Sequence, residues 1–258
     1  MENRYIEIFT GLRRDYGYAD INSAFKDPST GKLKLKYGWA AKELIDLDYI
    51  QHLEGKKSIG VQPCNDDGLA RFGAIDIDSD EYDNFDLRKY LEIIDKKNIP
   101  VVPVKSKSGG LHIYVFFKEP VKASYVRNFL DKLLFTFGLK ASTEIFPKQT
   151  QLGMGSDGKF INGNFINLPY YNRNERVGLN LDGTEFTFEQ FIKVVEANRK
   201  TREELEEFAT ELMRLELTGG ADEFADGPVC LQRLSKSKLD DYRDRFIYNY
   251  MVFAKKKY

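Results

Sequence analysis

The sequence predicts an α+β fold, and three features of its hydrophobic pattern lead to that prediction. Between residues 70 and 146, strand-like and helix-like periods follow one another in the order β-α-β-β-α-β. Residues 1–57 read as mostly helical or irregular, and from residue 186 the pattern turns helical again. The central order is that of the split βαβ, ferredoxin-like folds, which include the RNA-recognition-motif-like (RRM-like) folds. We therefore expect an RRM-like core with N-terminal α/β elements and a C-terminal helical region.

The elements leading into this core are predicted from period and turn signals. The best early helix is expected at 39–56, where apolar residues recur at roughly i, i+3, i+4 and i+7. Segments 58–64 and 70–78 read as strands, and "NDDG" at 65–68 is a strong turn signal between them. Helical spacing follows at 85–98, where Asn98 is a C-terminal stop.

The second half of the core continues the same alternation. A short apolar strand is expected at 99–105, a stronger strand at 111–117 and an amphipathic helix at 123–138 that ends at Gly138. Further short strands are expected at 142–146 and 164–171.

The C-terminal part reads as helical, with a long charged stretch at 186–217, a Gly-rich break and a last helix at 238–258. This last helix reaches the final residue without a stop signal, which favours truncation from a longer protein. We expect three regions, with boundaries at 1–57, 58–185 and 186–258.

Composition narrows the class of protein without naming a function. Of the 258 residues, 42% are apolar and 31% charged, as in ordinary globular proteins, and no apolar run is long enough to cross a membrane. The N-terminus lacks the apolar core of a secretory signal, and Cys64 and Cys230 form no disulfide framework, so we expect a cytoplasmic protein. The net charge of −1 does not exclude nucleic acid, because basic residues cluster at 32–36 and 96–107.

Two acids interrupt the apolar strand at 70–78. Asp76 and Asp78 alternate with Ile75 and Ile77, so both carboxylates project from one face, with Cα atoms about 6.6 Å apart. Neighbouring carboxylates repel each other unless a cation lies between them, and oxygen ligands favour Mg²⁺ or Mn²⁺. A solvated strand end with an acidic loop behind it explains the same pattern, so both interpretations stay open at this point.

The turn before the strand at 111–117 is the second candidate. Gly109 and Gly110 permit close approach of the backbone to a phosphate, and the amides of such turns bind anions. Lys105 and Lys107 flank the turn, and His112 opens the strand that follows. A purely structural histidine is the alternative.

A third acid, Glu144, lies in the short apolar strand at 142–146. A two-metal site needs such a carboxylate to bridge or complete both ions. Lys148 follows four residues later, where it is placed to meet a phosphate. Taken alone, Glu144 reads equally well as an ordinary edge-strand acid.

Together these features resemble the catalytic core of the archaeo-eukaryotic primase (AEP) superfamily, the primase-polymerases of phages, plasmids and mobile or CRISPR-linked systems. The resemblance rests on the order and spacing of "DID" (76–78), "SGGLH" (108–112) and "TEIF" (143–146). It extends to "HLEGKKSIGVQP" before the first motif and "GNFINLPYY" after the third, and "DGPVCLQRL" resembles the tail of phage-type members. Residues 58–185 would then be the primase-polymerase core, on which the N-terminal region packs.

The resemblance implies a DNA primase-polymerase, a nucleotidyltransferase that starts or extends primers on single-stranded DNA. It implies that Asp76, Asp78 and Glu144 hold two divalent ions, Mg²⁺ or Mn²⁺, and that His112 contacts the phosphates of an incoming dNTP or NTP. The other expected phosphate contacts are Lys105, Ser108, Gly109, Gly110 and Lys148.

The remaining expectations concern partners. Template would stack on Tyr170 and Tyr171 and contact Arg173. No zinc is expected, because the chain lacks a Cys/His set for it. A helicase domain or protein is an expected partner, a membrane is not, and the expected location is the cytoplasm of a bacterial, archaeal or phage-infected cell.

One departure from the family pattern keeps other functions open. Many members have Ser-x-His in the second motif, whereas Gly110 stands two residues before His112 here, so Ser108 or a backbone amide would replace that contact. A replication-initiator nuclease shares the fold but needs a second histidine where Gly110 stands. A non-catalytic single-strand-binding module is the other alternative, although three acids on its working face would repel a phosphate backbone unless metals were bound.

Overall fold

The structure is a computed structural model that describes the chain except residues 27, 29–32, 83–84, 108, 157, 159, 218–227, 235–248 and 253–258. It contains two compact units. The first comprises Met1–Leu130 and Glu144–Thr201, and the second comprises Asp131–Thr143 and Arg202–Tyr258. The domain boundaries expected after residues 57 and 185 stay a prediction.

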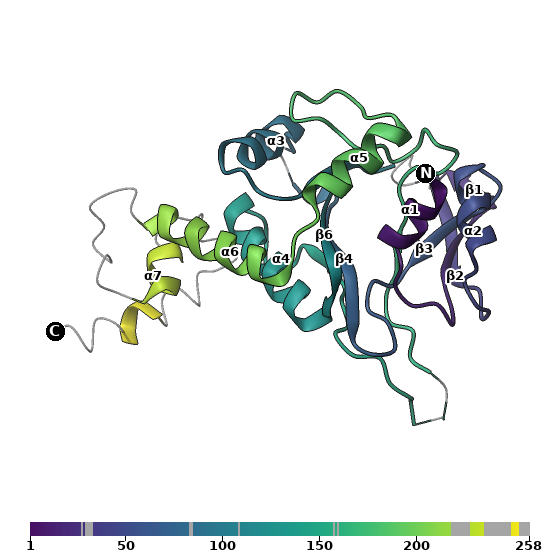
Figure 1. The fold of residues 1–258 in the computed structure, drawn as a ribbon, viewed down its shortest axis with the longest axis horizontal. Coiled ribbons are helices and arrows are strands. Elements are labelled where there is room, and N and C mark those ends of the chain that lie inside the picture. The colour runs from purple at the N-terminus through teal and green to yellow at the C-terminus, as the bar shows by residue number, and fades with distance from the viewer. Residues whose placement is uncertain are drawn as a thin grey trace. The chain divides into compact units, whose positions relative to one another are not determined.

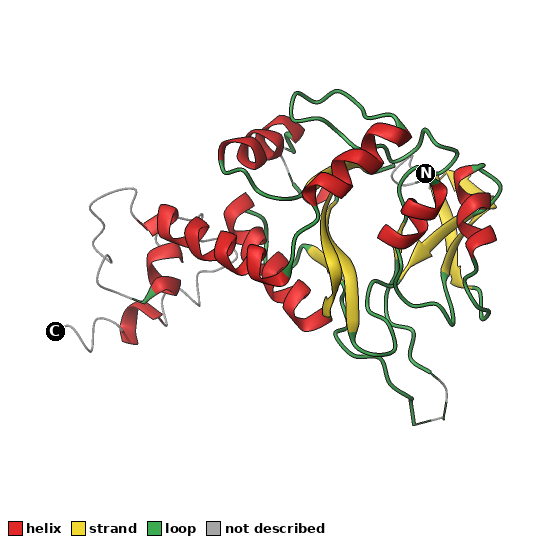
Figure 2. Cartoon of the chain, viewed as in Figure 1, coloured by secondary structure: helices red, strands yellow, loops and turns green. Residues whose placement is uncertain are grey.

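The chain is a mixed α/β protein with two antiparallel sheets (Figures 1 and 2). In chain order its elements are α1 (Glu2–Ile8), β1 (Gly17–Lys26), β2 (Leu33–Trp39), α2 (Asp46–Leu53), β3 (Ser58–Val61), β4 (Leu69–Ile77), the 3₁₀ turn η1 (Ser79–Glu81), α3 (Leu87–Lys96), β5 (Val102–Lys105), β6 (Leu111–Lys122), α4 (Ala123–Phe137), β7 (Glu144–Phe146), β8 (Ile166–Asn167), α5 (Phe188–Asn198), α6 (Arg202–Leu217) and α7 (Val229–Leu234).

Both sheets lie in the first unit. The first sheet has the strand order β2-β1-β3-β8 and the second the order β5-β6-β4-β7. All neighbouring strands pair antiparallel. The second sheet is made from the predicted stretch, in the element order β4-α3-β5-β6-α4-β7 that its periods indicate.

The central strand β4 is buried on both faces, which explains its nearly continuous apolar run. On one face Gly73 is covered by the side chains of Val126 and Leu130 from α4. On the other face Phe72 packs against Phe9, with ring centroids 5.3 Å apart. Asp76 is four residues beyond Phe72 and projects from that same face.

An aromatic core fills this second face. Phe9 follows α1 and makes edge-on contacts with Tyr114 and Phe116 of β6, at 5.8 and 5.6 Å between ring centroids. Tyr5 and Phe191 belong to the same buried cluster. These rings hold α1, α5 and both sheets together around the end of β4 that carries Asp76.

The N-terminal region differs from the prediction of a mostly helical segment. Two of its elements, β1 and β2, are strands, and they pair with each other. β1 also pairs with β3, so partners distant in the sequence decide its conformation. The helix expected at 39–56 is shorter, at Asp46–Leu53, because Trp39 ends β2 and Ala41 has a φ of 51°, which no helix accommodates.

Two other expectations need correction. The "NDDG" turn does not close a hairpin, because β3 and β4 belong to different sheets. The charged stretch at 186–217 forms two helices, α5 and α6, since Arg199 leaves the helical region with a ψ of 134°. The guanidinium of Arg199 donates hydrogen bonds to the carbonyl oxygens of Phe117 and Lys118, at 3.0 Å each, which hold the break between the two helices against β6.

The second unit is helical where it is described. α6 packs against α7, and the Arg233 guanidinium lies 5.0 Å from the centroid of the Phe135 ring. The helix expected at 238–258 falls mostly outside the described residues. No helix in the described part of the chain has the length and apolar character needed to cross a membrane.

Candidate active site

The three predicted motifs meet at one end of the second sheet. Asp76 is the cross-strand partner of His112 on β6 and also of Glu144 on β7. Residues directly opposite in an antiparallel pair have Cβ atoms about 5 Å apart. The strand register therefore brings an acid, a histidine and a second acid, which are far apart in the sequence, into one row.

This row contains buried polar atoms without hydrogen-bond partners. His112 Nε2 lies 3.1 Å from Asp76 Oδ1. The two atoms are not aligned as a hydrogen bond, so the buried Asp76 Oδ1 has no hydrogen-bond partner. The other ring nitrogen, His112 Nδ1, is also buried without one. Asn167 Oδ1 on β8 is likewise buried and has no hydrogen-bond partner. Since buried polar groups normally have partners, these three atoms among the described residues indicate a place where a ligand supplies them.

A cleft between the two sheets opens over this row, and it consists of two adjoining cavities. The larger, of about 370 Å³, is lined by both aspartates of the first motif and by His112. The smaller, of about 290 Å³, is lined by Asp76, His112 and Glu144. The two cavities share four lining residues, namely Tyr37, Asp76, His112 and Asn167.

The glycine turn lies at the edge of the larger cavity. A Cβ at Gly110 would come within 3.0 Å of the Ile77 carbonyl oxygen, so the backbone packs too closely there for a side chain. The Gly110 amide donates to Ser106 Oγ at 2.9 Å, and Ser106 lines the cavity. Gly109 has a φ of 88° and open space around it. Ser108 lies outside the described residues.

Two predicted lysines stand beside the cleft in ion pairs. Lys105 Nζ lies 3.2 Å from Glu185 Oε1, and Lys148 Nζ lies 2.5 Å from Glu144 Oε1. Neither lysine lines a cavity of the cleft, whereas Lys107 lines the larger one. Glu144 is therefore paired with a cation of the chain itself.

The carboxylates of the row are not gathered around a single point. Asp78 is exposed and follows the last residue of β4, and Glu144 is exposed on the edge strand β7. Within the described residues, no group of three or more His, Cys, Asp and Glu side chains is arranged to hold a metal ion.

The three predicted template contacts have different positions. Tyr170 is fully buried, and its hydroxyl donates to the Phe186 carbonyl oxygen, so it is a core residue that no template base can reach. Tyr171 lines the larger cavity. Arg173 lies outside the cleft, where its guanidinium is 2.6 Å from the Glu2 carboxylate.

Several residues of the cleft were not predicted as site residues from the sequence. The wall opposite the motifs includes Ser58, Asn167 and Arg176 in the larger cavity and Trp39 and Phe165 in the smaller one. Trp39 and Arg176 belong to no motif. Ser58 lies in "HLEGKKSIGVQP", and Phe165 and Asn167 lie in "GNFINLPYY", two stretches that support the family resemblance but predict no role for these residues. Each of the five comes from the first sheet or from a segment beside it. Pairing between β1, β3 and β8 brings them together.

Burial shifts the pKa of two groups beside the row. Burial, and secondarily the Asp76 charge, raises the pKa of Tyr114 above its ordinary value, so its hydroxyl stays neutral. Burial lowers the pKa of Arg176, but a guanidinium titrates so high that it remains a cation at neutral pH. The Arg176 Nε donates to the Leu168 carbonyl oxygen at 2.7 Å, which positions the group at the cavity.

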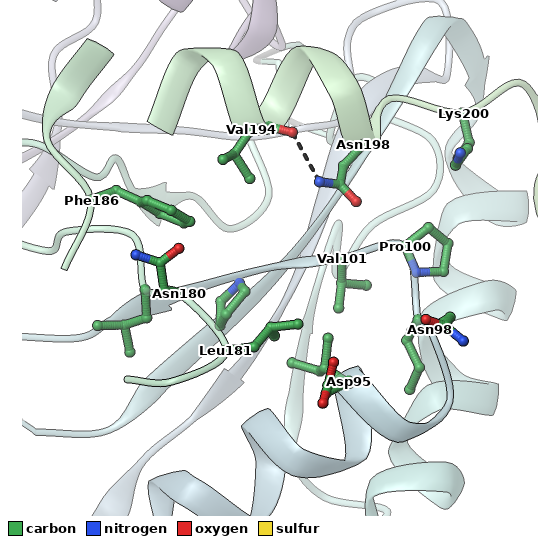
Figure 3. Close-up of a pocket in the computed structure, with 14 residues that line it drawn as sticks. Asp95, Asn98, Pro100, Val101, Asn180, Leu181, Phe186, Val194, Asn198 and Lys200 are labelled. Carbon is green, nitrogen blue, oxygen red and sulfur yellow. Dashed lines mark hydrogen bonds between the residues drawn. The ribbon is translucent and has the colours of Figure 1, made fainter. Parts of the chain in front are cut away.

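A third cavity, of about 400 Å³, lies away from the motifs between α3, the start of β5 and α5 (Figure 3). Its walls are mixed, with Val101, Phe186 and Val194 beside polar groups such as Asp95 and Asn98. None of the site residues predicted from the sequence lines it.

Comparison with known families decides the identity of the core. The model of the archaeo-eukaryotic primase domain of TOTE conflict systems matches residues 16–207, about three quarters of the chain. The chain belongs to this family. It is thus a member of the AEP superfamily of primase-polymerases, as the three motifs predicted, and the activity of this superfamily is nucleotidyl transfer.

Two further comparisons add little to the AEP assignment. A solved structure, the AEP domain of the cyanophage S-2L primase-polymerase, shares 11% identity and covers 74% of this chain and 94% of its own, with a TM-score of 0.37. At that TM-score the likeness carries no argument about the site. No curated protein matches the chain.

Proposed function

We propose that this AEP domain is a DNA primase-polymerase, which catalyses template-directed, divalent-metal-dependent nucleotidyl transfer on single-stranded DNA and starts or extends primers. The observation that carries the proposal is the register of the second sheet, in which Asp76 stands between His112 and Glu144. In the proposed reaction a 3′-hydroxyl attacks the α-phosphate of a dNTP or NTP, and pyrophosphate leaves. The template strand and a helicase domain or protein are the proposed partners.

We also infer that the second sheet, with α3 and α4, is the RRM-like split βαβ core. Its strand order β5-β6-β4-β7 supports this inference. Taken in chain order, its four strands stand in the spatial order 2-3-1-4, so the first and third lie in the centre and the second and fourth at the edges. A ferredoxin-like sheet has this arrangement, because each βαβ crossover leaves room for one strand in between.

The residues of the row fit a divalent cation in their chemistry. Asp76, Asp78 and Glu144 offer only oxygen, the ligand that Mg²⁺ and Mn²⁺ prefer. The Asp76 Oδ1 is buried without a hydrogen bond, which is costly unless a cation or donor binds it. We propose that these three residues hold two ions, which would neutralise charge on the attacking and leaving oxygens. The Glu144 carboxylate would first have to leave Lys148.

Groups of the chain itself are proposed to hold the triphosphate in the larger cavity. His112 has a ring nitrogen without a partner, and Lys107 and Arg176 supply positive charge at the same cavity. The Gly110 amide donates to Ser106 Oγ and the Gly109 amide to the Ser106 carbonyl oxygen, so each would have to leave Ser106 to meet a phosphate. The contact proposed for the Ser108 hydroxyl stays a prediction. Lys105 and Lys148 stay predictions, because each would have to exchange an ion pair for a phosphate.

The direct test is nucleotide incorporation on a single-stranded oligonucleotide, primed or unprimed, with labelled nucleotide and Mg²⁺ or Mn²⁺. The Asp76→Ala/Asp78→Ala protein is expected to lose incorporation by at least about 10³-fold, since two metal ligands are removed. Circular dichroism checks that the variant is folded. Unchanged incorporation in the folded double variant refutes the proposal. Cleavage of the oligonucleotide without nucleotide would point to the nuclease, and binding with neither reaction to a non-catalytic module.

A further inference from the structure

The two halves of the cleft differ in the chemistry of their walls. The larger cavity has two cations, Lys107 and Arg176, in its lining, together with the acids Asp76, Asp78 and Glu175. Among the described residues that line the smaller cavity there is no lysine or arginine, and its wall on the first sheet is aromatic, with Tyr37, Trp39 and Phe165. With the proposed metal ions on Asp76 and Asp78, the larger cavity suits an anionic group, so a ligand that spans both halves needs an anionic end and an apolar, flat end.

The ring of Phe165 packs against the backbone of two glycines. Gly17 on β1 and Gly60 on β3 are direct cross-strand partners. A Cβ at either position would lie within 3.0 Å of the Phe165 ring, so only glycine leaves room for the ring to lie across both strands. Glycine weakens a strand, and an aromatic ring over a glycine pair offsets part of that loss. The contact with the two glycines holds the Phe165 ring at the wall of the cleft.

Two more rings complete this aromatic surface, which consists of Tyr37, Trp39 and Phe165. Trp39 meets Phe165 edge-on at 5.2 Å, and Tyr37 lies 6.5 Å from Phe165, both measured between ring centroids. Tyr37 is 56% exposed although it lies beside a large apolar neighbour. The surface is therefore rigid on its Phe165 side and open on its Tyr37 side, as a stacking site requires.

A polar atom beside the aromatic surface also lacks a partner. Asn167 Oδ1 is buried without a hydrogen bond, and Asn167 lines both cavities. Nucleobases combine a flat apolar face with N–H donors at their edge, so they supply what both the rings and this oxygen lack.

We propose that the aromatic surface binds the base of the incoming nucleotide, whose triphosphate occupies the larger cavity. The inference rests on the proposed function and deepens it by naming the subsite for the base. A nucleotide has both of the ends that the cleft needs, an anionic triphosphate and a flat aromatic base. Asp76 and His112 line both cavities and so lie between the two proposed subsites. A template strand would instead bring phosphates to the half of the cleft that has no lysine or arginine in its described lining.

The chain provides its own reporter, because Trp39 is its one tryptophan. The experiment titrates the wild-type protein with a non-hydrolysable dATP analogue and Mg²⁺, without template, and follows tryptophan fluorescence. Stacking beside Trp39 is expected to change its emission in a saturable way. Phe165→Leu keeps the glycine pair covered but removes the ring, and it is expected to weaken nucleotide binding about tenfold.

The matched control is Phe160→Leu. Phe160 is 60% exposed and lines neither cavity, so this change is expected to leave nucleotide affinity unaltered. Inorganic tripolyphosphate serves as a second control, since it is expected to bind wild type and Phe165→Leu equally. Tyr37→Ala, at an exposed position that folding tolerates, repeats the test if Phe165→Leu does not fold.

Each outcome bears on the inference. Equal affinity of wild type and Phe165→Leu for the dATP analogue overturns it. So does a fluorescence change that a single-stranded oligonucleotide produces and the dATP analogue does not, because the aromatic surface then binds template. Nucleotide binding that depends on Phe165, without any incorporation, would support this subsite and at the same time contradict the proposed polymerase.

Discussion

The two walls of the cleft are built in different ways. The wall on the second sheet consists of Asp76, His112 and Glu144, which stand opposite one another on three paired strands. The wall on the first sheet consists of rings and amides, and its central ring, Phe165, precedes a strand of only two residues. The first wall is a set of motifs in a regular register. The second wall depends on which side chains the tertiary packing leaves at the cleft.

The comparison predicts that changes on the motif wall act on chemistry and changes on the other wall act on binding. His112→Ala is expected to have the largest effect after the aspartates. It should lower kcat for incorporation by about 10²–10³-fold, because a donor to the developing phosphate charge is lost. Steady-state incorporation at saturating nucleotide measures this loss. If kcat stays the same and only KM rises, the division between the two walls is broken.

Two alanine variants of the glycine turn, Gly110→Ala and Gly109→Ala, test the motif wall more finely. Gly110→Ala is expected to lower incorporation at least tenfold, because its Cβ would press on the Ile77 carbonyl oxygen next to Asp78. Gly109→Ala has open space and meets only the strain of a positive φ, about 1 kcal/mol, so activity should change little. Incorporation assays and thermal unfolding separate the two effects. Equal activity losses in both variants would contradict the close packing argued for Gly110.

The smallest effect is expected from the pH dependence of stability, through His52 beside the first sheet. His52 on α2 accepts a hydrogen bond from the Ile59 amide at Nδ1, and its Nε2 lies 3.0 Å from the Pro169 carbonyl oxygen. Burial, and secondarily the Arg176 charge, lowers the pKa of His52 to about 3, below its unfolded value of about 6.5. Between these values the unfolded state binds a proton that the folded state does not. The free energy of unfolding should therefore fall on acidification, by on the order of 1 kcal/mol per pH unit below about pH 6.

Urea unfolding at several pH values between 7 and 4 measures this slope. His52→Gln removes the titrating group and should flatten the curve over this range, while lowering stability at neutral pH because two buried contacts are lost. A slope that is unchanged in the variant would assign the pH dependence to other groups. Incorporation at neutral pH by the folded variant should stay near the wild-type rate, since His52 does not line the cleft.

Sequence reasoning succeeded where signals were local and failed where pairing was distant. The helix predicted at 85–98 lies at Leu87–Lys96, and the strand predicted at 111–117 lies at Leu111–Lys122. Both were predicted because their periods and end signals lie within the segments themselves. The strand at Gly17–Lys26 was missed, because its pairing with β3 outweighs its weak local preference. Tyr170 was expected at the template and lies in the core, since one tyrosine among 15 carries no sign of which side it faces.

By itself, the sequence determined the order of elements in the second sheet and the motifs that assign the chain to the AEP superfamily. Period, turn chemistry and motif spacing are properties of neighbouring residues, so no partner is needed to read them. Only the tertiary structure decided that Asp76 stands between His112 and Glu144, and that Phe165 lies across Gly17 and Gly60. Those contacts join residues tens of positions apart, and their geometry follows from strand register and packing, which only the folded chain defines.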